Sequence, residues 1–238
     1  MAAPRFSGPT DPRTAALIGL AGAVLSGIGD VLILGRPRSG LDFDRAVDMI
    51  PPHIVADPRW RSLWNGATLA PRRIHLGTVT GLVGIGVLQG LGLRGIARTV
   101  TTGRLRSLST ASATAFAASG VLTHLCCGVV ILAYRRAAGT GTADRAHPAP
   151  RSATPLLAAS AAATLAALAA FSGGLTVEAF RRTSAASRWT AVTPFPCVLA
   201  TLLTFGALPA PVAGYLRPAS MSIGLLAYFG VAAASVDR

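Results

Sequence analysis

The stretch AALIGLAGAVLSGIGDVLIL, residues 15–34, decides the fold class of this 238-residue chain. Apart from Asp30, its residues are apolar, glycine or serine. A run of this length can cross the hydrocarbon core of a bilayer as a helix. An ionisable side chain in such a segment is costly, so it usually faces the protein interior and often marks a functional site. Asp30 is therefore the first candidate functional residue.

The composition of the whole chain also indicates a membrane protein. Hydrophobic residues make up 51% and charged residues 13%, and the mean hydropathy is +0.53, whereas soluble domains carry about 25% charged residues. All 22 basic residues are arginine, and alanine is abundant, which indicates a GC-rich bacterial genome. We therefore predict a multi-pass protein of the bacterial plasma (inner) membrane.

The net charge of +13 raises the question of nucleic acid as a partner. The arginines lie between the apolar runs and form no single basic stripe. Nucleic-acid-binding proteins instead gather their basic residues on one face or stripe. Arginine next to a membrane span binds anionic lipid headgroups. The expected partner is the lipid bilayer, and no nucleic acid is expected.

Windows of about 19 residues identify about six apolar segments. Each must be a helix, because lipid offers backbone groups no hydrogen-bond partner. The predicted fold is an all-α, polytopic membrane bundle forming one domain over residues 1–238. The helices are expected near 14–34, 74–93, 113–134, 154–177, 192–215 and 219–236, with an interfacial loop at 35–73 and a flexible linker at 137–153.

The long first loop carries Trp60 and Trp64, which share a face if that segment is helical. Two interpretations stay open for this loop. It is an interfacial segment anchored by aromatic side chains, or a lid whose tryptophans contact a bound molecule.

Glycines recur four residues apart in the second segment, at Gly77 and Gly81 and again at Gly86 and Gly90. Small residues at this spacing let helix backbones approach closely. They serve either packing within one chain or a homo-oligomer interface.

No motif predicts a cofactor or a metal. The chain has no P-loop, no dinucleotide fingerprint and no nucleophile elbow. Its three cysteines lack zinc spacing and are read as apolar filler. Asp30 with His75 and His124 would be a bare two-histidine, one-carboxylate set with no ligand-spacing motif, so no metal is expected.

The ionisable groups of the predicted spans fall at two depths. At ~1.5 Å per residue, Asp30 lies about 6 Å, and His124 about 15 Å, below the end of the bundle opposite the N-terminus. His75 begins the second span at that same end. Glu178 lies at the other end, where the spacing favours pairing with Arg181 or Arg182.

These depths predict one intramembrane site. Asp30 and His124 are the candidate catalytic residues, and a bound molecule would contact His75, Ser26, Thr123, Trp60 and Trp64. Ser26 is four residues before Asp30 and shares its helix face.

A carboxylate beside an imidazole in an apolar bundle allows three roles. It is a hydrogen-bonded tie between helices, a general acid and base acting on a small lipophilic substrate such as an isoprenoid or lipid, or a proton relay. These correspond to a structural subunit, a membrane-embedded cyclase or isomerase, and a proton-coupled transporter.

Several short motifs resemble those of an uncharacterised family of multi-pass bacterial membrane proteins. The resemblance implies that Asp30 and His124 occupy family motif positions, and it implies no reaction. The chain departs from the family pattern at Thr193 and near Ser222, where the family has asparagine. The motifs are Gly29-Asp30, Trp60-Arg61-x-Leu63-x-x-Gly66, Gly120-x-x-x-His124, Thr193-Pro194-Phe195, Leu208-Pro209 and Ile223-Gly224.

Overall fold

A computed structural model describes residues 11–34, 70–140, 148–181, 193–207, 216 and 218–235, without the side chains of 134–140, 148–154 and 206. Every regular element in the described part of the chain is a helix, which confirms the all-α prediction. In chain order these are α1 (Pro12–Leu34), α5 (Pro71–Gly81), η2 (Leu82–Gln89), α6 (Gly90–Ala97), α7 (Gly103–Thr140), α8 (Pro148–Arg181), α9 (Pro194–Gly206) and α11 (Ser220–Ser235).

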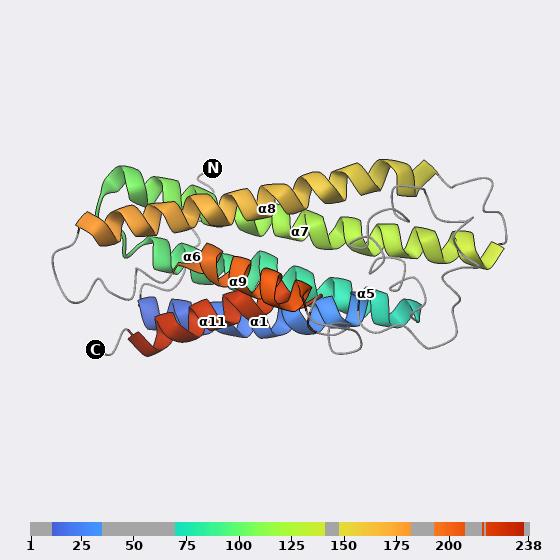
Figure 1. Cartoon of the computed structure of the whole chain (residues 1–238), viewed down its shortest axis with the longest axis horizontal. Coiled ribbons are helices and arrows are strands. Elements are labelled where there is room, and N and C mark those ends of the chain that lie inside the picture. The colour runs from blue at the N-terminus through green and yellow to red at the C-terminus, as the bar shows by residue number, and fades with distance from the viewer. Residues whose placement is uncertain are drawn as a thin grey trace, which may run out of the picture.

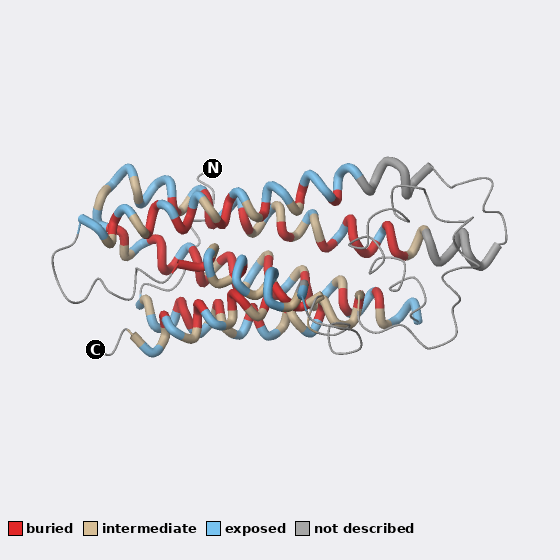
Figure 2. Tube along the Cα trace, in the orientation of Figure 1, coloured by how far each residue is buried: buried red, intermediate tan, exposed pale blue. Residues whose placement is uncertain are grey.

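The helices run roughly along one axis (Figure 1). The two long helices α7 and α8 pair side by side along most of their length. On their other side, α1 packs against the consecutive elements α5, η2 and α6, and also against α11. The short helix α9 packs mainly on α11 and also contacts α8. Buried residues line the faces that these helices turn toward one another (Figure 2).

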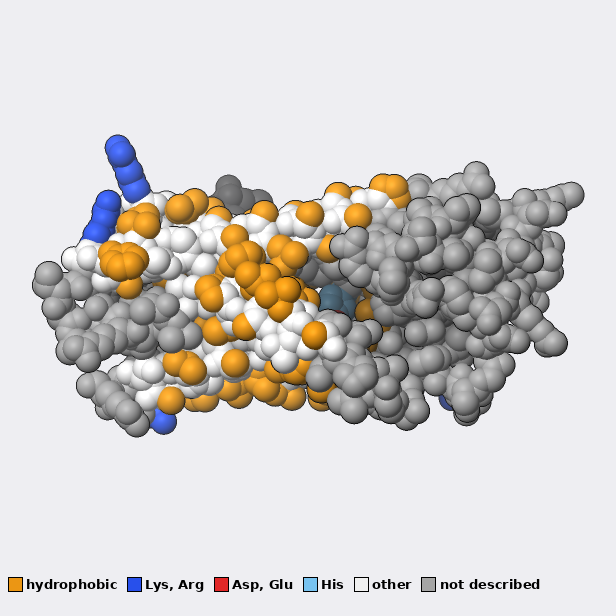
Figure 3. All heavy atoms as spheres, in the orientation of Figure 1, with side chains coloured by type: hydrophobic (Ala, Val, Ile, Leu, Met, Phe, Trp, Pro, Cys, Tyr) orange, Lys and Arg blue, Asp and Glu red, His pale blue; other side chains and the backbone are white. Residues whose placement is uncertain are grey.

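Among the described residues, four helical segments are long and apolar enough to cross a membrane: Pro12–Leu34, Pro71–Ala97, Gly103–Ala133 and Pro155–Arg181. The last two helices, α9 and α11, have only 13 and 16 residues. Large apolar side chains are exposed, including Leu76 (56% exposed) and Leu203 (67% exposed), and Figure 3 shows apolar patches over the described part of one face. Such a surface suits lipid and would be unfavourable in water.

Several helix boundaries differ from the sequence-based expectation; for example, α7 begins at Gly103 rather than near residue 113. Helix α5 begins at Pro71, inside the expected loop, because proline suits the first turn of a helix. Both edges of the expected linker 137–153 are helical: α7 continues to Thr140 and α8 begins at Pro148, and residues 141–147 lie outside the described residues. The alanines at its two edges favour the helical state. The predicted tryptophan contacts of the first loop lie outside the described residues.

Helix α1 begins at an acidic cap. The Asp11 carboxylate accepts hydrogen bonds from the backbone N–H of Thr14 (2.7 Å) and Arg13 (3.3 Å), and from the Thr14 hydroxyl (2.6 Å). These bonds satisfy donors that the first turn of a helix leaves open. The Thr14 hydroxyl, followed by its N–H, lowers the pKa of Asp11 below its ordinary value.

This cap predicts a pH dependence. Because the folded-state pKa lies below the unfolded value of ~3.9, the cap stabilises α1 fully above that value. The stabilisation is lost as the pH falls through the lower, folded-state pKa. Unfolding of the Asp11→Asn variant should lack this acid-dependent step while keeping a cap. Unfolding midpoints measured from pH 6 down to about pH 3 check it, and identical pH profiles for both proteins would contradict the capping role.

Glycine brings α1 against α5 and η2 at backbone distance. A Cβ atom placed on Gly22 would lie 2.7 Å from Gly84 O, and one on Gly29 would lie 2.8 Å from Gly77 O. The expected glycine-mediated approach therefore occurs within one chain. It brings the polar side chains of α1 within reach of their partners.

Candidate functional site

Asp30 and His124 meet inside the bundle, as the sequence predicts. Oδ1 of Asp30 lies 3.0 Å from Nε2 of His124, which joins α1 to α7. The Asp30 side chain is 12% exposed and the His124 side chain 6%. The pair is thus nearly enclosed and lies within two of the four membrane-length segments.

The second oxygen of Asp30 begins a chain of hydrogen bonds. Oδ2 accepts from the hydroxyl of Ser222 on α11 at 2.8 Å. The Ser222 and Ser26 hydroxyls are 2.9 Å apart, and Nε2 of Gln89 donates to the Ser26 hydroxyl at 2.6 Å. We call His124, Asp30, Ser222, Ser26 and Gln89 the polar chain. It draws together α1, η2, α7 and α11.

Two features of the second span shape the polar chain. Gly81 leaves the space that the His124 ring occupies, because a Cβ at Gly81 would overlap the ring. Directly after Gly81, the helix widens into the eight-residue π-helix Leu82–Gln89. The π-helix ends at Gln89, the terminal member of the polar chain. π-Helices are rare and are frequently found at functional sites.

An arginine holds the end of α1 near Asp30. Nε and Nη2 of Arg73 each donate a hydrogen bond of 3.0 Å, to the carbonyl oxygens of Leu32 and Val31. The last carbonyls of a helix lack intrahelical partners, and a cation there is favourable. Arg73 therefore fixes the backbone directly after Asp30.

The structure joins only part of the predicted contact set. Ser26 belongs to the polar chain, but His75 is exposed on α5 and has no hydrogen bond or ion pair with Asp30 or His124. The Thr123 hydroxyl faces α8, where it donates to Ser160 Oγ at 3.0 Å. Trp60 and Trp64 lie outside the described residues.

Glu178 is 2% exposed and lies where α8 passes the turn before α7. Its Oε1 accepts from the backbone N–H of Thr101 at 2.9 Å and also from the Thr101 hydroxyl, and its Oε2 accepts from the Thr102 hydroxyl at 3.1 Å. The carboxylate thus stabilises the start of α7, a role that the expected arginine pairing did not include. Arg182 lies outside the described residues.

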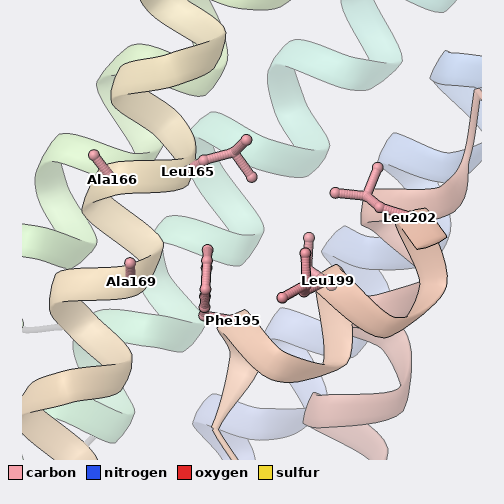
Figure 4. A pocket seen from close by; sticks show the side chains of 7 residues that line it. Leu165, Ala166, Ala169, Phe195, Leu199 and Leu202 are labelled. Carbon is pink, nitrogen blue, oxygen red and sulfur yellow. The ribbon is translucent and has the colours of Figure 1, made fainter.

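A separate apolar groove of about 240 Å³ lies between α8 and α9 (Figure 4). Its seven lining residues are all apolar, and none belongs to the polar chain. The groove offers hydrocarbon contact without a reactive group. It is lined by Leu165, Ala166, Ala169, Phe195, Val198, Leu199 and Leu202.

No group of three His, Cys, Asp or Glu side chains in the described ranges is placed to hold a metal ion. Cys126 and Cys127 are buried free thiols. The reactive groups of the site are thus a carboxylate, an imidazole, two hydroxyls and an amide, which can bind polar atoms and exchange protons.

Sequence reasoning missed Gln89 and did not place Ser222 in the site. Gln89 carries the one amide side chain of the second span, and it is fully buried. Its Oε1 has no hydrogen-bond partner in the described part of the chain. A search for all polar groups in the spans, and not only for ionisable ones, would have found it.

The fold and the site together define a class: a protein whose described part is helical, with four membrane-length apolar helices in that part and a nearly enclosed carboxylate–imidazole pair. The chain belongs to the family described as a family of unknown function, DUF6796, whose profile matches residues 11–237. No curated protein and no solved structure matches the chain. The predicted membership of an uncharacterised family is thereby confirmed, while the bacterial source stays a prediction.

Proposed function

We propose that this protein is an integral protein of the bacterial plasma membrane that binds a small lipophilic molecule, of isoprenoid or lipid type, at the polar chain and transforms it by acid–base chemistry. Four apolar helices and an apolar outer surface support the membrane location. The groove between α8 and α9 offers further contact for hydrocarbon. Such a substrate reaches the site through the bilayer.

The observation that carries the proposal is the 3.0 Å contact between Asp30 Oδ1 and His124 Nε2 within the bundle. A carboxyl group and an imidazole at this distance can hold a proton between them and donate or accept it. An isomerisation adds one proton to the substrate and removes another. It therefore returns the pair to its starting state and requires no electron transfer.

The π-helix favours a functional role over a purely structural tie. An α-helical second span would keep its backbone hydrogen bonds in the better α geometry. The segment from Leu82 to Gln89 departs from it just where Gly81 admits the His124 ring and Gln89 reaches Ser26. Departures of this kind in an α-helix are concentrated at functional sites.

The hydrogen bonds beyond Asp30 favour a second candidate, a proton-coupled transporter. The Ser222 and Ser26 hydroxyls and the Gln89 amide extend the polar chain away from the imidazole. Hydroxyl groups both donate and accept, so such a chain can pass a proton along. A structural subunit, in which the polar chain only fixes helix packing, is the third alternative.

The variants Asp30→Asn and His124→Gln separate these roles. We expect both to fold in detergent with near wild-type yield, because amides keep hydrogen-bonding groups at both positions. We also expect both to lose the transformation of the bound lipophile. Mass spectrometry of the small molecules that co-purify with each protein is the measurement, and His75→Gln is the matched histidine control.

A defined isoprenoid or lipid that co-purifies with the wild type, and whose product disappears in both variants, is the expected result. Bulk phospholipid alone in all samples would contradict binding of a specific lipophile. Loss of folded yield in both variants would instead identify a structural tie. Proton uptake by vesicles that depends on Asp30, without any product, would identify the transporter.

A further inference from the structure

We propose that one end of the bundle is a binding surface for anionic phospholipid headgroups. This arginine end comprises the start of α1, the turn between α6 and α7, and the end of α8, which lie together at one end of the molecule (Figure 1). It carries six exposed arginines, and blue side chains project there in Figure 3. They are Arg13, Arg94, Arg98, Arg104, Arg106 and Arg181.

Two acidic side chains, Glu178 and the exposed Asp11, are described at this end, against six arginines. The Glu178 carboxylate is 2% exposed and is bound by Thr101 and Thr102. The Asp11 carboxylate caps α1. The arginine end therefore presents an excess of positive charge. One of the six guanidinium groups is held by the backbone: Nε of Arg106 donates to the carbonyl oxygen of Val100 at 2.7 Å.

Apolar neighbours distinguish a lipid surface from nucleic acid or soluble phosphate. Phe180, next to Arg181, is 87% exposed. Leu17, one turn after Arg13, is 49% exposed, and Leu108, close to Arg104 on α7, is 48% exposed. Arg13, Arg104 and Arg181 thus each have an exposed apolar side chain nearby on the same helix. Guanidinium groups bind phosphate bidentately, and neighbouring apolar and aromatic side chains suit the edge of the hydrocarbon.

The test measures which phospholipid the purified full-length chain retains. Detergent-solubilised protein is incubated with equal amounts of phosphatidylglycerol and phosphatidylcholine, and the retained lipid is counted by mass spectrometry. The wild type should enrich phosphatidylglycerol. Since each arginine near a membrane surface contributes roughly fivefold, the triple variant Arg94→Gln/Arg104→Gln/Arg181→Gln should lower the enrichment by about tenfold or more.

The control Arg72→Gln, an exposed arginine at the opposite end, should keep the wild-type preference. So should Asp30→Asn, because this surface does not depend on the polar chain. No preference in the wild type, an unchanged preference in the triple variant, or equal loss in Arg72→Gln would overturn the proposal. Competition by inorganic phosphate, or binding of duplex DNA that the triple variant abolishes, would overturn it in favour of a soluble partner. If the triple variant folds poorly, Arg104→Glu alone must still lower the enrichment, and an unchanged value would overturn the proposal.

Discussion

Replacing Gly84 with alanine is expected to force η2 away from α1 and to lower the free energy of unfolding by about 3 kcal/mol, the upper end of ordinary overpacking. The new Cβ would lie 2.6 Å from the backbone nitrogen of Ser26 and 2.8 Å from the carbonyl oxygen of Gly22. Both neighbours are backbone atoms, so no side-chain rotation relieves the overlap. The separation would also stretch the hydrogen bond from Gln89 to Ser26.

Gly173→Ala is the matched control. Gly173 lies within α8, and a Cβ placed there meets nothing within 4 Å. Alanine at this position should raise stability by about 0.5–1 kcal/mol, since glycine weakens a helix interior. Unfolding midpoints in detergent measure both variants. Equal stability of Gly84→Ala and Gly173→Ala would show that α1 and η2 do not touch at backbone distance.

Replacing His124 with leucine is expected to cost about 3–5 kcal/mol of unfolding free energy. The substitution leaves the Asp30 carboxylate nearly enclosed, with the Ser222 hydroxyl as its remaining partner in the polar chain. A buried charge without its counter-charge is strongly unfavourable, whereas an apolar pair of similar volume is often neutral. The double variant Asp30→Leu/His124→Leu should therefore recover much of the loss.

The measurement is a double-mutant cycle: unfolding midpoints of Asp30→Leu, of His124→Leu and of the double variant are compared with the wild type. The control is Thr123→Ala, next to His124 on α7 but directed at α8. Costs of the two single substitutions that simply add in the double variant would contradict direct coupling of Asp30 and His124. Recovery of stability in the double variant would be compatible with the acid–base proposal. That variant would keep the fold but lose activity, since it lacks the carboxylate and the imidazole.

The helices could be predicted from the sequence because each apolar run is long, and because a backbone that crosses lipid must satisfy its hydrogen bonds within a helix. The second span was predicted as one helix, and Pro71–Ala97 is continuous in the structure. Its π-helical centre was not predictable. A π-helix depends on what the neighbouring helices require at that depth, and the glycines of the span are equally compatible with an α-helix.

Depth along a helix could also be estimated from residue number, which is why Asp30 and His124 were placed in one site. The direction in which each side chain points could not be estimated from residue number. Thr123 and His124 are adjacent, yet successive residues of a helix point about 100° apart. The Thr123 hydroxyl accordingly reaches Ser160 on α8, while the His124 ring faces Asp30 on α1.

The sequence by itself determined that this protein is built of apolar helices and that Asp30, Ser26 and His124 lie within them, because hydropathy and spacing are local properties of the chain. Only the tertiary structure decided that Ser222 and Gln89 complete the polar chain and that His75 stays outside it. Hydrogen-bond partners on different helices are set by how those helices rotate and how closely they pack. Glycine contacts made far apart in the sequence, such as Gly22 with Gly84 and Gly81 with His124, determine that packing.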